Sequence, residues 1–227
     1  MNNAGFLHRT VHQVLASDLM PTKFIAGQLR KPTGPFGRWL LAGGLNEGNR
    51  GLLAATLDAL APVAQERFLD VGFGGGAALR MAASRTAGAL YGVDFSADMV
   101  LRGHKVLADL CSAGRLNLLT ADVADLPLRS ELVHTILTTN TIYFWPDLAG
   151  ALAELKRVLA PGGRLALGYH GREKLAQLSP VTQHGFRLFA PGDLEEPLRV
   201  AGFGDVQTIA LQEQALNGDF VTIAKRG

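Results

Sequence analysis

Two carboxylates stand on either side of a glycine-rich run. Asp70 comes two residues before Gly72, and the run Gly72-Phe73-Gly74-Gly75-Gly76 leads into a segment rich in Ala, Leu and Met. Asp94 follows 22 residues after Gly72. Glycines allow a sharp turn and a close approach of a ligand, and a carboxylate placed after the next strand can accept hydrogen bonds from both ribose hydroxyls. The spacing predicts a site for a ligand that contains adenosine.

Two kinds of ligand fit this turn. Gly72, Gly74 and Ala77 satisfy the dinucleotide pattern G-x-G-x-x-A, which makes an NAD(P)-dependent oxidoreductase one alternative. Asp70 favours another ligand, because a carboxylate beside the turn repels a pyrophosphate and suits a cationic amino acid end. The turn also lies about seventy residues into the chain, whereas dinucleotide folds usually begin near their fingerprint. A tight turn that binds no ligand remains a third interpretation.

Short apolar runs alternate with helical patterns from Asn49 onward. We predict strands at 67–71, 89–93, 116–119, 132–138, 164–169, 206–211 and 220–224, and helices at 52–60, 76–84, 97–110, 147–159 and 191–201. This alternation is typical of a mostly parallel sheet covered on both faces. The last two strands are joined by about eight residues, which permit a hairpin but no crossover helix. The sheet is therefore predicted to end antiparallel.

Residues 1–46 lack this regular pattern. We predict that they form an N-terminal cap with a short helix around 7–16, ahead of a main domain at 47–227. His8 and His12 are four residues apart and would share one face of that helix. No pattern of Asp or Glu completes a metal-binding set with them, so we predict no metal site.

Polar side chains follow the third, fourth and fifth predicted strands. Asp122 comes after the third strand, Asn140 and Tyr143 after the fourth, and His170 after the fifth. Ligands of open α/β sheets bind outside the carboxyl ends of the strands. Tyr143 and His170 are therefore candidate catalytic residues. Core packing is the alternative role for Tyr143, and a loop-capping role is the alternative for His170.

Several segments together resemble the class I S-adenosylmethionine-dependent methyltransferases, of the type seen in ubiquinone/menaquinone and small natural-product pathways. The segments are 68–76, 91–99, Asp122, 140–147 and 157–163. Each is common alone, but their order and spacing are specific. The resemblance covers about residues 48–225 and implies a Rossmann-like, doubly wound α/β fold with seven strands, the last of them antiparallel.

The resemblance also implies which residues bind S-adenosylmethionine as the cosubstrate. They are Asp70, Gly72, Gly74, Asp94, Phe95, Met99, Asp122, Val123 and Asn140. In this assignment Asp70 lies at the methionine end, Asp94 holds the ribose hydroxyls, and Asp122 and Val123 bind the adenine edge. Met99 lies against adenine and Asn140 near the sulfonium.

The activity implied is in-line displacement at a methyl carbon attached to a positive sulfur. A protein contributes to such a reaction mostly by alignment and desolvation, and a general base is needed only when the nucleophile must lose a proton. We predict transfer to a small organic acceptor at O, N or C. A methyltransferase-like protein that only binds its ligand is the remaining alternative.

Composition limits the partners and the compartment. The formal net charge is +2 and no dense Lys/Arg tract is present, so a nucleic-acid partner is not expected. Cys111 is the only cysteine, which excludes a disulfide within the chain and fits a reducing, cytoplasmic compartment. No apolar run approaches the ~18 residues of a membrane span. We expect a monomer or a homodimer.

Overall fold

The computed structural model describes residues 21–31, 33–34, 49–177, 179–213 and 216–227. The helix predicted around 7–16, with His8 and His12, lies outside these residues, as does most of the predicted cap.

Seven strands form one sheet in the order β3-β2-β1-β4-β5-β7-β6. Their bounds are Phe68–Val71 (β1), Leu90–Asp94 (β2), Leu116–Thr120 (β3), Val133–Thr139 (β4), Leu159–His170 (β5), Phe203–Ala210 (β6) and Asp219–Arg226 (β7). The pairs from β3 across to β5 are parallel, and β7 runs antiparallel to both β5 and β6. The predicted α/β fold with an antiparallel last strand is confirmed.

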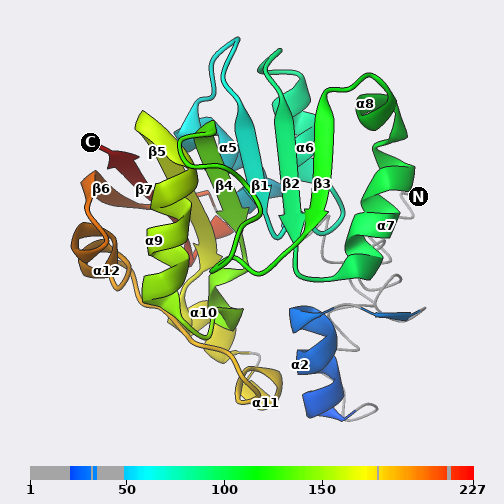
Figure 1. The fold of residues 1–227 in the computed structure, drawn as a ribbon. Coiled ribbons are helices and arrows are strands. Elements are labelled where there is room, and N and C mark those ends of the chain that lie inside the picture. Colours follow the sequence, from blue (N-terminus) through cyan, green and yellow to red (C-terminus); the bar gives the residue numbers. More distant parts are fainter. Residues whose placement is uncertain (1–20, 32, 35–48, 178, 214–215) are drawn as a thin grey trace.

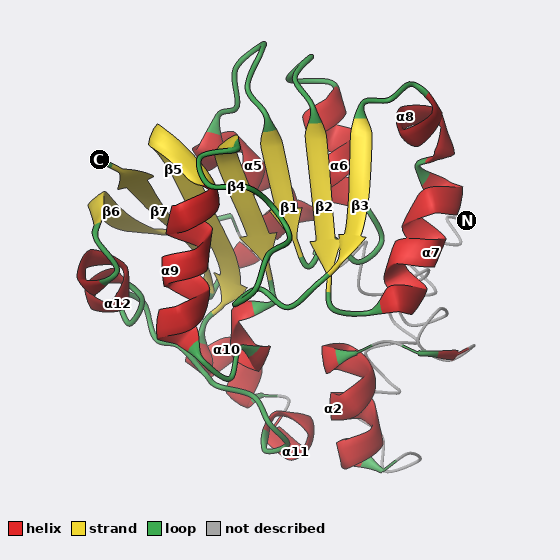
Figure 2. Cartoon of the chain, viewed as in Figure 1, coloured by secondary structure: helices red, strands yellow, loops and turns green. Residues whose placement is uncertain are grey.

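Helices cover both faces of the sheet (Figure 2). Their bounds are Thr22–Arg30 (α2), Arg50–Leu60 (α5), Ala77–Ala83 (α6), Ala97–Val106 (α7), Ala108–Ser112 (α8), Leu148–Val158 (α9), Arg172–Ala176 (α10), Ser179–Thr182 (α11) and Glu195–Val200 (α12), with a 3-10 turn at Ile142–Phe144. One apolar cluster contains Leu52 of α5, Leu79 of α6 and Val100 of α7. The other contains Leu155 of α9 and Leu198 of α12. The sheet is thus buried on both sides, which explains its apolar strands.

Several predicted boundaries are wrong. The helix predicted at 97–110 is divided into α7 and α8, because Leu107 leaves the helical conformation, and its buried side chain packs against Gly76. The helix predicted at 191–201 spans only Glu195–Val200.

The strand predicted at 164–169 begins earlier, at Leu159, with an irregularity over 160–163, since Val133 pairs with Leu159 and Thr135 pairs with Arg164. The strand predicted at 206–211 begins at Phe203.

Beyond the carboxyl ends of the parallel strands lie α2, α10 and α11 (Figure 1). Helix α2 contacts the segment after β5 through a hydrogen bond of 2.9 Å between Thr22 Oγ1 and His184 Nε2. Two segments far apart in the sequence therefore meet beyond the strand ends. Among the described residues no helix is long and apolar enough to cross a lipid bilayer.

The packing of α9 gives a stability prediction. Leu155 is fully buried, so Leu155→Ala is expected to lower the free energy of unfolding by about 2–5 kcal/mol through lost burial and a cavity. Leu101 of α7 is 62% exposed, and Leu101→Ala is the matched control with an expected change within about 0.5 kcal/mol. Urea denaturation measures both variants. Equal effects would contradict this assignment of the core.

Candidate functional site

The glycine turn after β1 is packed directly against the end of β4. Gly72 has φ +75°, and its N–H donates to Val93 O at 2.7 Å. A Cβ at Gly72 would collide with the methyl group of Thr141, which follows Asn140. Only glycine fits here, because the backbone is left-handed and the neighbouring side chain fills the space. The turn and Asn140 are thereby brought together, as the sequence predicts.

Asp94 holds this turn in shape. Its Oδ2 accepts from the Gly74 N–H at 3.0 Å, and its Oδ1 accepts from the Ser96 N–H at 2.9 Å. Burial raises the pKa of the Asp94 carboxyl, and the two backbone hydrogen bonds oppose that rise. Each carboxylate oxygen keeps a further lone pair, so the group can still accept from a hydroxyl of a ligand.

Asp70 is buried at the end of β1 with 3% of its surface exposed. Within the described residues its carboxyl group has no hydrogen-bond partner. Burial raises the pKa of Asp70 to about 8, and the nearby charge of Asp94 adds to that rise. A cationic group at this place would favour the ionised form, whereas an anionic pyrophosphate would disfavour it further. The arrangement suits a ligand with an amino acid end.

Four predicted cofactor residues follow β2 and β3, three of them (Met99, Asp122 and Val123) assigned to the adenine. Met99 and Val123 are buried, while Phe95 is 47% exposed. Asp122 fixes its own turn, because its Oδ1 accepts from the backbone N–H two residues on at 2.9 Å. Lys31, just after α2, lies over the Phe95 ring with Nζ 4.4 Å from the ring centroid. The segment that contains α2 therefore reaches the predicted adenine side.

Tyr143 joins the ends of β4 and β5. Its hydroxyl donates to Asn140 Oδ1 at 2.8 Å and accepts from the His170 N–H at 2.5 Å. Burial raises the pKa of Tyr143 well above its usual value of 10, so the hydroxyl keeps its proton at neutral pH. This geometry suits a residue that positions Asn140 and His170. The catalytic role predicted for Tyr143 stays a prediction.

Sequence reasoning assigned no functional role to Asp219 or Lys174. His170 Nδ1 lies 2.6 Å from Asp219 Oδ1, and Lys174 Nζ lies 2.7 Å from the same oxygen. Asp219 directly precedes the predicted last strand, but only the register of that antiparallel strand brings it opposite His170. Asp219 could have been found only from the pairing register of the hairpin, which the sequence does not specify.

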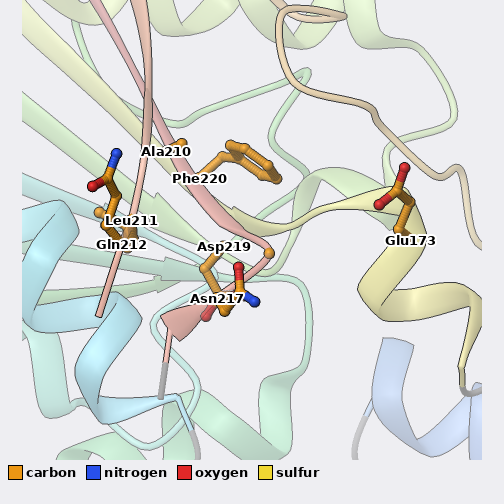
Figure 3. Close-up of a pocket in the computed structure, with 8 residues that line it drawn as sticks. Glu173, Ala210, Leu211, Gln212, Asn217, Asp219 and Phe220 are labelled. Carbon is orange, nitrogen blue, oxygen red and sulfur yellow. The ribbon is translucent and has the colours of Figure 1, made fainter. Parts of the chain in front are cut away.

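Two surface cavities lie apart from the predicted cofactor residues. The first has a volume of about 450 Å³ and is lined by Glu173, residues 210–212 and residues 217–220. Figure 3 shows Asp219 between Glu173 and the Gln212 side of this cavity. The second, of about 420 Å³, lies between α2 and residues 183–185. Asp219 is thus the residue that connects the first cavity to the cluster around His170.

Residues 69–167 match the family model described as a methyltransferase domain. This segment of the chain is thus similar to methyltransferase domains. The chain is 35% identical over 103 residues to a ubiquinone/menaquinone biosynthesis C-methyltransferase of Geotalea daltonii, a match that covers 44% of each chain. It is 32% identical over 138 residues to the aklanonic acid methyltransferase of a Streptomyces species, covering 60% of this chain and 57% of the relative.

The structure of an S-adenosylmethionine-dependent methyltransferase from Aquifex aeolicus matches this chain with a TM-score of 0.66 and 22% identity, over 80% of this chain and 94% of that one. This likeness supports the fold. The chain spans about half the length of the two curated relatives. The comparisons give the oxidoreductase alternative no support.

The raised pKa of Asp70 makes stability depend on pH. In the folded protein the carboxyl group holds its proton up to about pH 8, whereas in the unfolded chain it loses the proton near its ordinary value of 3.8. The folded state therefore binds more protons between these values, and this contribution to stability is lost as the pH rises through that window. Asp70→Asn removes the dependence.

We expect Asp70→Asn to gain stability relative to the natural protein as the pH rises from 5 to 8. Urea denaturation at both pH values measures the difference between the two proteins. Asp109→Asn, on the surface of α8, is the control and should show no such gain. A difference for Asp70→Asn that does not grow with pH would show that Asp70 is ionised in the folded protein.

Proposed function

We propose that this methyltransferase transfers the methyl group of S-adenosylmethionine to a small organic acceptor at O, N or C. The observation that carries the proposal is the buried Asp70 carboxyl group, which has no partner among the described residues and lies beside the glycine turn. A carboxylate in such a place is costly unless a cation pairs with it. The α-amino group of a bound methionine moiety is a cation of the right kind.

The other predicted cofactor residues have matching chemistry. Asp94 keeps lone pairs for two ribose hydroxyls while its backbone hydrogen bonds hold the turn. Phe95 offers exposed apolar surface to an adenine ring, and Asp122 offers a carboxylate to its amino group. Met99 and Val123 are buried nearby in the sequence, after the same strand ends. When bound, the cosubstrate supplies a methyl carbon activated by the sulfonium. The protein then has to align that carbon with the acceptor and exclude water.

The relatives' names support an acceptor of low molecular weight. One relative is named for ubiquinone/menaquinone biosynthesis and another for aklanonic acid. The sequence identity to these relatives is low and the matches cover only part of their length. The acceptor of this chain therefore has to be inferred from its own residues. We propose no nucleic-acid partner, a monomer or homodimer, and a cytoplasmic location, supported by the near-neutral charge and the single cysteine.

We further propose that residues 1–46 act as a cap on a catalytic domain at 47–227. Two contacts of the described part support it. Lys31 lies over Phe95, and Thr22 binds His184 beyond the strand ends. Closure over the cofactor would exclude water from the transfer.

Removal of the Asp94 carboxylate tests the cofactor assignment. Asp94→Ala is expected to weaken S-adenosylhomocysteine binding by about tenfold to a hundredfold, which corresponds to about 1–3 kcal/mol. Isothermal titration calorimetry measures the affinity. Asp109→Ala is the matched control, because Asp109 is a surface carboxylate paired with Arg80.

The same titration is run with NADH. The proposal expects binding of S-adenosylhomocysteine and no binding of NADH by the natural protein. Tight binding of NADH alone would overturn it in favour of a dinucleotide enzyme. An unchanged affinity in Asp94→Ala would refute the role of Asp94. Cofactor binding without label transfer to any acceptor would favour a protein that only binds.

A further inference from the structure

We propose that His170 is the general base of the transfer, that Asp219 positions it, and that the acceptor carries a hydroxyl group on an aromatic or enolic ring. This inference rests on the proposed methyl transfer and adds a proton-accepting group to it. It assigns a role to Asp219 and Lys174.

The fold itself brings the pair together. His170 is the last residue of β5 and Asp219 the first of β7, and the antiparallel register places them directly opposite one another. Lys174 lies in α10, four residues after His170 in the sequence, and binds the same Asp219 oxygen. Asp219 is 2% exposed, so its carboxylate is held by these two partners and little by water. Its position is fixed from two sides.

Hydrogen bonding determines which nitrogen of His170 carries the proton. The Tyr143 hydroxyl accepts from the His170 backbone N–H and donates its own proton to Asn140 Oδ1. That bond sets the Asn140 amide so that Nδ2 faces His170 Nε2 at 3.3 Å. Asn49 Oδ1, which can only accept, lies 3.1 Å from the same nitrogen, so the two amides do not decide which role Nε2 takes. The Asp219 carboxylate decides it, because it can only accept and lies 2.6 Å from Nδ1, which places the proton of the neutral ring on Nδ1.

The protonated form of His170 also has a partner. Nε2 lies 3.1 Å from Asn49 Oδ1, an acceptor at the start of α5. In the neutral ring Nε2 accepts from Asn140, and after it gains a proton it can donate to Asn49. The negative charge of Asp219 stabilises the resulting imidazolium. Each of the two states of the ring thus has one hydrogen-bond partner at Nε2.

His170 is reachable and lies beside the proposed cofactor turn. Its side chain is 18% exposed, unlike that of Asp219. Asn140, its hydrogen-bond partner, is followed by Thr141, whose methyl group packs on Gly72. Nε2 is thus linked through Asn140 and its neighbour Thr141 to the turn that would hold the methionine end.

Aromatic rings packed on Tyr143, whose hydroxyl group bonds the His170 backbone, indicate the kind of acceptor. Phe186 stacks on Tyr143 with ring centroids 6.0 Å apart and meets Phe144 edge-on at 4.7 Å. Phe144 and Phe186 are only half-buried, so they offer apolar ring surface. A carboxylate or a neutral amine attacks without losing a proton first, whereas a phenol, with an ordinary pKa of about 10 like that of tyrosine, gains from a base. The site therefore fits a hydroxylated ring.

The proposed step balances as follows. His170 Nε2 takes the proton of the acceptor hydroxyl, and the oxygen forms a bond to the methyl carbon. The electron pair of the carbon–sulfur bond leaves with the sulfur, which becomes a neutral thioether. The products are a methyl ether, S-adenosylhomocysteine and an imidazolium, which then returns its proton to water.

Nitrogen NMR tests the positioning without turnover. In ¹⁵N-histidine protein loaded with S-adenosylhomocysteine, we expect neutral His170 as the Nδ1–H tautomer. His134 is the internal contrast, because its Nδ1 accepts from the Arg67 N–H at 3.0 Å and its proton must lie on Nε2. His170→Gln and His134→Gln assign the two signals. A neutral His170 with its proton on Nε2 would overturn the proposal.

Label transfer from methyl-labelled S-adenosylmethionine tests the base. The probes are phenol, 4-cyanophenol and 4-nitrophenol at pH 8, which differ in acidity. We expect His170→Gln to lower transfer to phenol by about a hundredfold or more and to 4-nitrophenol by much less, because the nitrophenol is already ionised. Asp219→Asn should lower transfer to phenol by about tenfold or more. His134→Gln should leave it unchanged.

Calorimetry with S-adenosylhomocysteine separates this inference from the proposed function. Every variant is expected to keep the natural affinity. Loss of binding by the natural protein would refute the proposed function. Binding with no transfer to any phenol would refute the acceptor class. Equal losses for all three phenols in His170→Gln would refute the role of His170 as a base.

Discussion

The burial of Asp70 at the carboxyl end of β1 is the constraint on which the site depends. A carboxyl group placed there has a pKa raised to about 8 and has no hydrogen bond among the described residues, so it opposes folding in its ionised form. The surrounding sheet tolerates it because β1 lies between β2 and β4, with apolar clusters on both faces. Such a group is explained by a cationic ligand that pairs with it.

The remainder of the site is organised by short polar contacts at the ends of adjacent strands. Asp94, at the end of β2, accepts a hydrogen bond from the Gly74 N–H of the glycine turn. Tyr143 ties the end of β4 to that of β5 through Asn140 and His170. Because the parallel strands all end at the same edge, these contacts form a continuous row from the proposed ribose site to the proposed base. The proposed cofactor site and the proposed base therefore lie along one edge of the sheet.

The sequence predicts much of this arrangement because its signals are local. Apolar runs predict all seven strands, and Asp70, Gly72 and Asp94 lie within one strand-turn-helix-strand unit. Contacts set by tertiary packing were not predictable. Asp219 meets His170 only through the register of an antiparallel hairpin, and Leu107 breaks a helix only because it packs on Gly76.

Proton release on cofactor binding tests the central claim most directly. Calorimetric titration with S-adenosylhomocysteine at pH 7, in two buffers of different ionisation enthalpy, measures the protons exchanged. Pairing of the ligand's amino group with Asp70 requires that carboxyl group to ionise, so we predict release of about one proton by the natural protein and none by Asp70→Asn. Binding with no proton release, or the same release in both proteins, would contradict the account.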